Sequence, residues 1–276
     1  MRIPFTKAHG AGNDFLLTWM KDAPRENHAE AARAICERHT GIGADGWILV
    51  SQPPTGDKAY DGAIQLYNSD GSLAELSGNG TRCAAAFLVD VGLAADSLRI
   101  KTGAGVKQLQ LLERSGESFV FEMNMGTPLF PEGDHVTIEV FSGRQTATIV
   151  DVGNPQCVVR VSSFESQWRR IGADLESHRR FPNRTNVSFV LPVDEHTLDV
   201  RFYERGAGET LSSGTGSTGA AAAALRWGVV KSPVTILTPA GPLKLRSEGA
   251  EIYLIGPAQI IGGGEFYFRG ENETSA

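Results

Sequence analysis

The chain lacks the features of several large classes of protein. Its 276 residues include 26 Lys and Arg against 32 Asp and Glu, so the net charge is −6. An acidic balance of this kind argues against a surface for nucleic acid or anionic membrane. No run approaches the roughly 18 to 20 consecutive apolar residues of a membrane span, and the first residues lack the apolar core of a signal peptide. We therefore expect a cytoplasmic protein that binds neither nucleic acid nor membrane.

Residues for metal binding and for common catalytic motifs are also scarce. The chain has three cysteines, Cys36, Cys83 and Cys157, which cannot all pair and whose spacing matches no zinc pattern. Its six histidines are scattered, and no HExxH, GxSxG or Walker A lysine motif occurs. The segment GIGADG at 41–46 fits GxGxxG but precedes a strand-like run, so the fingerprint of a dinucleotide-binding helix fails. These absences predict a protein of a reducing compartment without a bound metal or cofactor.

What the sequence does contain is a repeat. Residues 65–86 read QLYNSDGSLAELSGNGTRCAAA, and residues 201–222, 136 positions later, read RFYERGAGETLSSGTGSTGAAA. The two segments align without a gap, so Ser77 falls on Ser213, and each serine is followed by a glycine turn and an alanine-rich run. A repeat at half the chain length predicts two like domains. If these faced each other, one reactive side chain would lie on either side of a single carbon atom.

Strand-like and helix-like segments alternate in both halves, which predicts an α/β (α+β) fold with two pseudo-symmetric domains. In each domain we expect a mixed β-sheet or barrel wrapped around a central alanine-rich helix. These helices are expected from Asn79 or Gly80 to about Val91 and from Gly214 to Trp227. Alanine permits close approach to a tightly curved sheet; the alternative is a helix of good intrinsic propensity with no special neighbour.

The domain boundary is expected where glycine and proline cluster. Such a cluster, from Gly126 to Pro131, lies between the two halves, and clusters of this kind mark loops. We expect an N-terminal domain of residues 1–127 plus 264–276 and a C-terminal domain of residues 128–263.

Two more helices and a strand-rich tail complete the expected pattern. Apolar periodicity predicts a helix over His28–His39, and another is expected over Glu165–Ser177 in the second half. The last part of the chain, Val234–Phe268, reads as a series of short strands because Gly and Pro interrupt it.

The repeated Ser-Gly-x-Gly turn can hold an anion. The turns at 77–80 and 213–216 each precede a helix, and a helix N-terminus offers unpaired N–H groups and the positive end of the dipole. Glycine lets a ligand approach the backbone closely. The simpler interpretation is a serine N-cap followed by glycines that ease the turn. Because the turn occurs twice at equivalent positions, we favour a shared site for a carboxylate or phosphate.

Several polar side chains lie in loops that would line the same site. Asn68 and Glu204 occupy equivalent positions in the repeat, and Arg205 could bind a substrate carboxylate through two hydrogen bonds. Considered alone, such an arginine is more often part of a surface ion pair. Asparagines in Gly-rich turns are usually turn formers, so their role depends on the site around them. These asparagines are Asn13, Asn154 and Asn186.

Long motifs in a fixed order carry a family resemblance. They are KAHGAGNDFLL near the start, GIGADG, YNSDGSLAELSGNGTRCAAAFL, DVGNPQCVV, NRTNVSF and YERGAGETLSSGTGS. In these motifs, which are spread over nearly the whole chain, the sequence resembles diaminopimelate epimerases. The resemblance implies two pseudo-symmetric α/β domains with the active site in the cleft between them. It also implies PLP-independent conversion of LL-diaminopimelate to the meso form on the route to lysine and peptidoglycan, a small amino acid as substrate, and a homodimer as an unsurprising assembly.

The resemblance further implies a two-base exchange and a set of site residues. In the family one cysteine thiolate removes the α-proton, and a second cysteine, as a thiol, delivers a proton to the opposite face. The catalytic positions correspond to Ser77 and Ser213, with Glu204 as a base toward Ser213. The substrate-binding positions correspond to Asn13, Asn68, Gly78, Asn79, Asn154, Asn186, Glu204, Arg205, Gly214 and Thr215. No metal ligand is implied.

The sequence departs from the family pattern at the catalytic positions. Ser77 and Ser213 stand where the family has cysteines, Gln156 replaces a histidine that usually follows Asn-Pro, and Thr218 also differs. A cysteine pKa of about 8.5 is lowered further at a helix N-terminus, whereas a serine hydroxyl is almost never ionised at neutral pH. Beside an active epimerase, three interpretations stay open. They are serines engineered to trap an inactive enzyme, a related racemase or hydroxy-amino-acid dehydratase, and a silenced homologue that only binds an amino acid.

Overall fold

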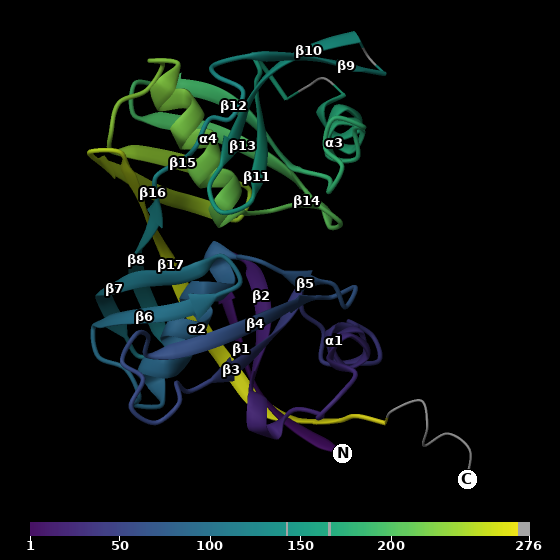
Figure 1. Cartoon of the computed structure of the whole chain (residues 1–276), viewed down its shortest axis with the longest axis vertical. Helices are drawn as coiled ribbons and strands as arrows, with labels where there is room; N and C mark the ends of the chain where they lie inside the picture. Colours follow the sequence, from purple (N-terminus) through teal and green to yellow (C-terminus); the bar gives the residue numbers. More distant parts are fainter. Residues whose placement is uncertain (142, 165–166, 270–276) are drawn as a thin grey trace. The chain divides into compact units, whose positions relative to one another are not determined.

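The chain passes between two structural units within two of its strands. The computed structural model describes residues 1–141, 143–164 and 167–269. Unit 1 comprises residues 1–123 and the described residues from Pro257 onward, and unit 2 comprises Asn124–Gly256 (Figure 1). The boundaries fall inside β8 (Ser118–Gly126) and β17 (Glu251–Tyr267), a few residues before the positions expected from the sequence.

Eight strands of unit 1 pair into a closed ring (Figure 1). From β1 to β8 the successive pairings are antiparallel, parallel, antiparallel, parallel and twice antiparallel, with the short β5 (Leu73–Ala74) paired to β4 alone. β17 closes the ring because it pairs with both β8 and β1. The other strands are β1 (Arg2–Gly10), β2 (Asn13–Trp19), β3 (Gly46–Ser51), β4 (Gly62–Asn68), β6 (Ser97–Thr102) and β7 (Gly105–Ser115).

Unit 2 repeats this order of strand directions. From β10 to β17 the pairings are again antiparallel, parallel, antiparallel, parallel and twice antiparallel. β9 (Val136–Val140) joins the edge of β10, and β14 (Gly208–Thr210) pairs with β13. The other strands are β10 (Gly143–Asp151), β11 (Pro155–Arg160), β12 (Asn186–Asp194), β13 (Thr197–Glu204), β15 (Val234–Thr238) and β16 (Gly241–Glu248). The internal repeat of the sequence is thus a repeat of topology.

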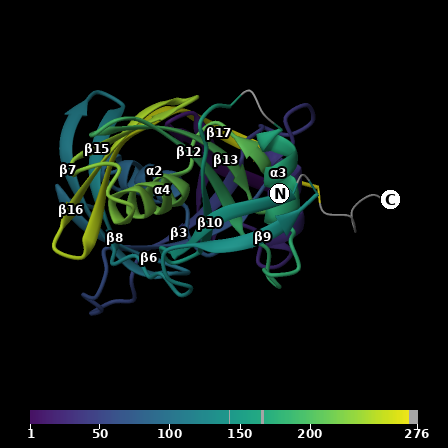
Figure 2. The same cartoon turned by 90° about the horizontal axis from the view of Figure 1, so that it is seen from above.

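An alanine-rich helix lies inside the sheet of each unit (Figures 1 and 2). α2 (Gly78–Asp90) contacts β1 to β4 and β6, and α4 (Gly214–Arg226) contacts β10 to β13, β15 and β16. Every alanine of both helices is buried. The space is tight, since a Cβ atom at Gly219 would lie 2.9 Å from Cγ of Gln156. The expected enclosed helices and the mixed α+β fold are confirmed.

Two shorter helices pack against the sheets from other sides. α1 (His28–Cys36) contacts β3 and β4, and α3 (Trp168–Glu176) contacts β12 and β13. The first two residues of the helix expected over Glu165–Ser177, residues 165 and 166, lie outside the described residues. Among the described residues, none of the helices has the length and apolar character needed to span a bilayer.

The helix expected over His28–His39 ends earlier, at Cys36. Glu37 is extended (φ −62°, ψ 129°), and its carboxylate accepts hydrogen bonds from the backbone N–H groups of His39 and Thr40. Bonds from a side chain to nearby backbone offer an alternative to the helix. The expectation was wrong for the last three residues for this reason.

The tail does not consist of short strands only, because β17 continues unbroken for 17 residues. Pro257 lies between the residues that pair with β16, which end at Ile255, and those that pair with β1, which begin at Gln259. Its missing N–H therefore falls outside both of these ladders. The backbones approach closely at Gly263, where a Cβ atom would lie 3.0 Å from the carbonyl oxygen of Phe5.

Candidate active site

Each repeated turn forms the start of an enclosed helix. Ser77 is the N-cap of α2 (φ −130°, ψ 119°), and its Oγ accepts a hydrogen bond from the backbone N–H of Gly80 at 3.0 Å. Ser213 caps α4 in the same way (φ −140°, ψ 122°) and accepts from Gly216 N at 3.1 Å. Both serines are thus N-caps, and any catalytic role is additional to this one.

The capping serines leave other backbone groups at each turn unpaired. In the described chain, the N–H groups of Gly78 and Asn79 have no hydrogen-bond partner, and neither do those of Gly214 and Thr215. All four residues are buried. Buried backbone N–H groups are rarely left without a partner, and those at a helix N-terminus bind carboxylate or phosphate. Each turn can therefore hold one anionic group.

In unit 2 a carboxylate faces the capping serine. Ser213 Oγ donates a hydrogen bond to Glu204 Oε1 at 2.6 Å, and Thr210 Oγ1 donates to Glu204 Oε2 at 2.8 Å. The hydroxyl of Ser213 therefore points its proton at the carboxylate while its lone pair accepts from Gly216. This is the geometry of a hydroxyl whose proton an adjacent general base can take.

In unit 1 a buried cation lies behind the equivalent turn. The side chain of Arg82 is fully buried; its Nε donates to Pro257 O at 3.1 Å, Nη1 to Gly78 O at 3.3 Å, and Nη2 to Asn79 Oδ1 at 2.6 Å. Burial lowers the pKa of Arg82 to about 10, so the guanidinium stays charged at neutral pH. At the equivalent position of α4, the neutral Thr218 donates to Gly214 O at 2.8 Å. The two turns match in backbone geometry and differ in the charge beside them.

Two of the expected asparagines of unit 1 meet at the turn. Asn79 Nδ2 donates to Asn13 Oδ1 at 3.4 Å, and Asn13 Nδ2 donates to Asp45 Oδ2 at 2.7 Å. Asn68 is bonded within the β4–β5 hairpin, where its Nδ2 donates to Ser72 Oγ at 2.9 Å. The structure thus joins Asn13 to Asn79 and the helix start, and places Asn68 at the end of a neighbouring strand.

The expected asparagines of unit 2 form two bonded groups. Asn154 Nδ2 donates to Thr215 Oγ1 at 3.3 Å, and Gln156 Nε2 donates to Asn154 Oδ1 at 2.7 Å. Asn186 Nδ2 donates to Pro155 O, and Asn186 Oδ1 accepts from the backbone N–H of Arg205 at 3.1 Å. Asn154 therefore touches the α4 turn directly, whereas Asn186 fixes the backbone that carries Arg205.

Three buried polar atoms around the α4 turn lack a partner within the described chain. They are Gln156 Oε1, Ser212 Oγ and Ser217 Oγ. Buried polar atoms are normally hydrogen-bonded, so an unpaired group points to a water or ligand that binds there. Sequence reasoning missed Ser217, Thr210 and Arg82. Only Arg82 gives a signal in the sequence. It is the one charged residue between Ser77 and Asp90.

The cysteines cannot replace the two serines as bases. Cys36, Cys83 and Cys157 are buried and unpaired, and burial raises the pKa of each thiol to about 12. A thiolate is the reactive form of cysteine, and these thiols are almost entirely protonated at neutral pH. The hydroxyls of Ser77 and Ser213 at the two turns are therefore the candidates for the role that a thiolate would have.

Comparison with known proteins assigns the chain to a family. The family model described as diaminopimelate epimerase matches residues 5–131 and 148–261. The chain belongs to the diaminopimelate epimerase family. It is 36% identical over 282 residues to a diaminopimelate epimerase of Pelotomaculum thermopropionicum, covering 96% of this chain and 99% of that protein. It is 38% identical over 292 residues to the diaminopimelate epimerase of Burkholderia ambifaria, covering 96% and 98%.

A solved structure shares the fold at low sequence identity. The crystal structure of a hydroxyproline epimerase from Agrobacterium vitis, with bound trans-4-hydroxy-L-proline, aligns with a TM-score of 0.74 at 16% identity and covers 96% of this chain and 90% of that one. This likeness supports the fold alone, and the family membership rests on the sequence matches.

Proposed function

We propose that the protein is a PLP-independent diaminopimelate epimerase that converts LL-2,6-diaminopimelate to meso-diaminopimelate in lysine biosynthesis. The observation that carries the proposal is the pair of serine-capped helix starts, each with two unpaired buried N–H groups. These groups would bind the α-carboxylate and stabilise the charge that develops on it when the α-proton leaves. The names of the family relatives support the substrate and the reaction class.

In the proposed reaction, Ser213 and Glu204 take the proton from one face of the α-carbon. The α-proton passes to Ser213 Oγ as the Oγ proton passes to Glu204, with which it is already hydrogen-bonded at 2.6 Å. The electron pair of the broken C–H bond is delocalised into the α-carboxylate. Ser77 Oγ–H then donates a proton to the opposite face. Glu204 releases the proton that it accepted to solvent, and solvent reprotonates Ser77. The reverse reaction exchanges the roles of the two serines.

The remaining expected residues would hold the substrate. We propose that Gly78, Asn79, Gly214 and Thr215 contact the α-carboxylate and that Asn13 and Asn154 orient these turns. The distal carboxylate and amino group would bind Arg205, Glu204, Asn68 and Asn186, of which Arg205 offers the bidentate partner. We also propose that the enzyme acts in the cytoplasm, where its three unpaired cysteines stay reduced, and that it assembles as a homodimer.

The decisive experiment is α-hydrogen exchange of LL-diaminopimelate in deuterated water, followed by proton NMR. We expect loss of the α-proton signal together with appearance of the meso isomer. The exchange rate should be lower than that of family members with cysteines at these positions. An ionised serine is far more basic than a cysteine thiolate, and a general base works best with a pKa near the operating pH. Absence of exchange over hours at high enzyme concentration would reject the proposal.

A second candidate function is favoured by the asymmetry of the two turns. Of the two capping serines, Ser213 alone has a carboxylate of the described chain within hydrogen-bonding distance, and a hydroxy-amino-acid dehydratase needs a base on one face only. Such an enzyme would release ammonia or an unsaturated product from a hydroxylated amino acid. A silenced homologue would instead show a ligand-dependent rise in melting temperature, which follows RT ln(1 + [L]/Kd), without turnover of any amino acid.

A further inference from the structure

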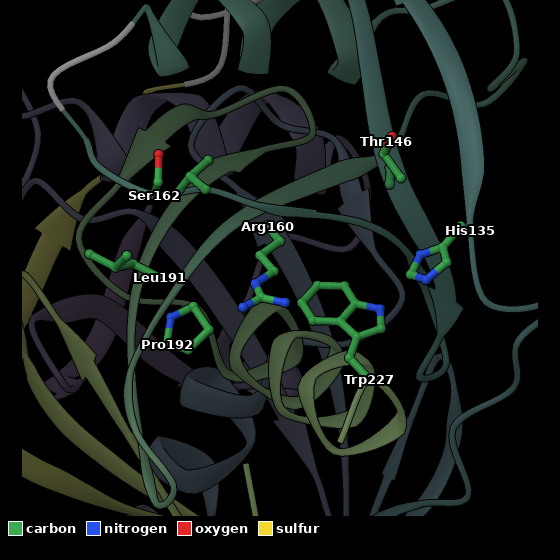
Figure 3. A pocket seen from close by; sticks show the side chains of 9 residues that line it. His135, Thr146, Arg160, Ser162, Leu191, Pro192 and Trp227 are labelled. Atoms are coloured by element: carbon green, nitrogen blue, oxygen red, sulfur yellow. The ribbon is translucent and has the colours of Figure 1, made fainter. Parts of the chain in front are cut away.

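Unit 2 contains a cavity that the proposed function does not use (Figure 3). Its volume is about 780 Å³, within the range of roughly 300 to 1,000 Å³ that is typical of small-molecule sites. Its walls come from β10, from the end of β11 and the two residues after it, from β12, and from the residues that precede β9 and follow α4. They combine two basic side chains, Arg160 and His135, with the apolar surfaces of Trp227, Leu191 and Pro192.

The cavity lies at the end of α4 that is remote from the Ser213 turn. The helix starts at Gly214 and ends at Arg226, just before Trp227, and its 13 residues span about 20 Å. β11 leads in the same direction, with Gln156 bonded to Asn154 near its start and Arg160 at its end. Two elements therefore separate the cavity from the catalytic turn, so a ligand in the cavity would not occupy the substrate site.

The side chains of the cavity are arranged around an indole ring. Trp227 Nε1 donates to Thr148 Oγ1 at 2.9 Å, and the ring of His135 stacks on the indole with centroids 6.5 Å apart and an interplanar angle of 27°. Figure 3 shows the guanidinium of Arg160 between the indole of Trp227 and the ring of Pro192. The tryptophan is thus fixed by its own hydrogen bond and by the stacked imidazole ring.

Arg160 is the available cation of the cavity. Its side chain makes no hydrogen bond or ion pair with the described part of the chain, whereas the nearby Arg226 is paired with Asp134. An arginine beside an aromatic face offers both a planar fork for an oxyanion and a stacking surface. Hydroxyls at Ser162 and Thr146 add further hydrogen-bonding groups to the walls.

We propose that this cavity binds a small organic anion that has a planar apolar body and a carboxylate or phosphate head. The head would pair with Arg160, and the body would lie against the apolar surfaces of Trp227, Leu191 and Pro192. The cavity is too large for an inorganic ion alone, and its charge excludes a cationic ligand of the same shape. The proposal does not depend on the epimerase activity.

Four probes of matched shape test the charge and the body separately. Isothermal titration calorimetry on the full chain would compare benzoate, phenyl phosphate, benzamidine and inorganic phosphate. We expect saturable binding of benzoate or phenyl phosphate, whichever head the site prefers, and at least tenfold weaker binding of benzamidine and of inorganic phosphate. Diaminopimelate should not compete, because it would occupy the other end of α4. No saturable binding of either aromatic anion up to millimolar concentration would overturn the proposal.

Two arginine variants locate the binding. Arg160→Gln should weaken the preferred probe at least tenfold, whereas Arg179→Gln, which removes an exposed arginine of the same unit outside the cavity, should leave its Kd unchanged. Arg160 could instead only stabilise the C-terminus of α4 through the helix dipole. In that case Arg160→Gln would lower the melting temperature and leave probe binding intact, which would also reject the proposal. Trp227→Phe keeps an aromatic ring and should therefore weaken binding of the probe less than Arg160→Gln does.

Discussion

Ser77 and Ser213 make the same capping hydrogen bond, yet opposite charges lie close to them. Glu204 accepts a hydrogen bond from Ser213, whereas the buried guanidinium of Arg82 bonds to Gly78 and Asn79 in the turn that Ser77 opens. A carboxylate helps its serine to lose a proton, and a cation stabilises an anion at its turn. At the residue scale, this difference favours the Ser213 turn as the basic half of the site and the Ser77 turn as the half that holds negative charge.

Replacing both serines by cysteine tests whether the scaffold still supports proton exchange. Ser77→Cys combined with Ser213→Cys should raise the rate of α-hydrogen exchange of LL-diaminopimelate by about two orders of magnitude or more, because a thiol at a helix N-terminus has a pKa far closer to neutrality. Proton NMR in deuterated water measures the rate. The single variants serve as controls and should gain less, since each face needs its own group. A double variant that folds and binds the substrate but exchanges the α-hydrogen no faster would contradict this prediction. It would show that the rest of the pocket has diverged, and Gln156 would be the first residue to test.

Arg82→Met tests the buried cation against its neutral counterpart. The substitution leaves three acceptors without a donor, and each lost hydrogen bond of this kind costs about 1 to 3 kcal/mol. Part of this loss is offset, because the variant no longer buries a charged group, which itself costs free energy. We expect the free energy of unfolding in urea to fall by about 2 to 4 kcal/mol and the KM for the amino acid to rise about tenfold, with a smaller change in kcat.

Thr218→Val is the matched control for Arg82→Met. It removes the equivalent bond, from Thr218 Oγ1 to Gly214 O, without changing any charge. It should cost about 1 kcal/mol of unfolding free energy and leave the KM close to that of the unaltered protein. An equal rise of the KM in both variants would show that packing at the helix starts, and not the charge of Arg82, governs substrate binding.

At the scale of elements, the sequence predicts what repeats and misses what tertiary contacts decide. The enclosed helices are visible as two alanine-rich runs behind equal turns. The strands β2 and β11 cannot be recognised in the sequence in this way, because a short run of consecutive buried residues has no alternation of apolar and polar residues to reveal a strand. β17 runs through Pro257 since that residue lies between two ladders. The orientation of Asn154 toward Thr215, and of Arg82 toward Asn79, depends on packing that no local pattern contains.

The end of α1 supplies a pH-dependent prediction. Backbone hydrogen bonds from Thr40 and His39 lower the pKa of Glu37 to about 2, below the value of about 4.3 of an unfolded glutamate. Because the folded-state pKa is depressed, the stabilisation is present above the unfolded pKa and is lost as the pH falls toward 2. Glu37→Gln should therefore lower the melting temperature at pH 6, and the difference should shrink toward pH 2. A difference that does not depend on pH would show that the carboxylate charge is unimportant for the helix end.

At the scale of the whole molecule, the duplicated topology explains why one repeat in the sequence predicts so much. Each unit has the same order of strand directions and the same enclosed helix, so two serine-capped helix starts follow from one motif. The cavity beside Trp227 has no counterpart in that motif. Its residues come from five separate segments of unit 2, and their proximity depends on the curvature of the sheet around α4.

The three buried cysteines make the integrity of both units measurable. Burial raises the pKa of each thiol well above its ordinary range, to about 12. A folded-state pKa above the unfolded one means that this contribution to stability is fully present below pH 9 and is lost as the pH rises toward 12. At pH 8 the folded protein should therefore not react with a thiol reagent within minutes, and all three cysteines should react in denaturant. Mass spectrometry distinguishes Cys36 and Cys83 of unit 1 from Cys157 of unit 2. Reaction of Cys157 alone under native conditions would mean that unit 2 opens independently, whereas simultaneous reaction of all three would mean that the chain unfolds as one cooperative system.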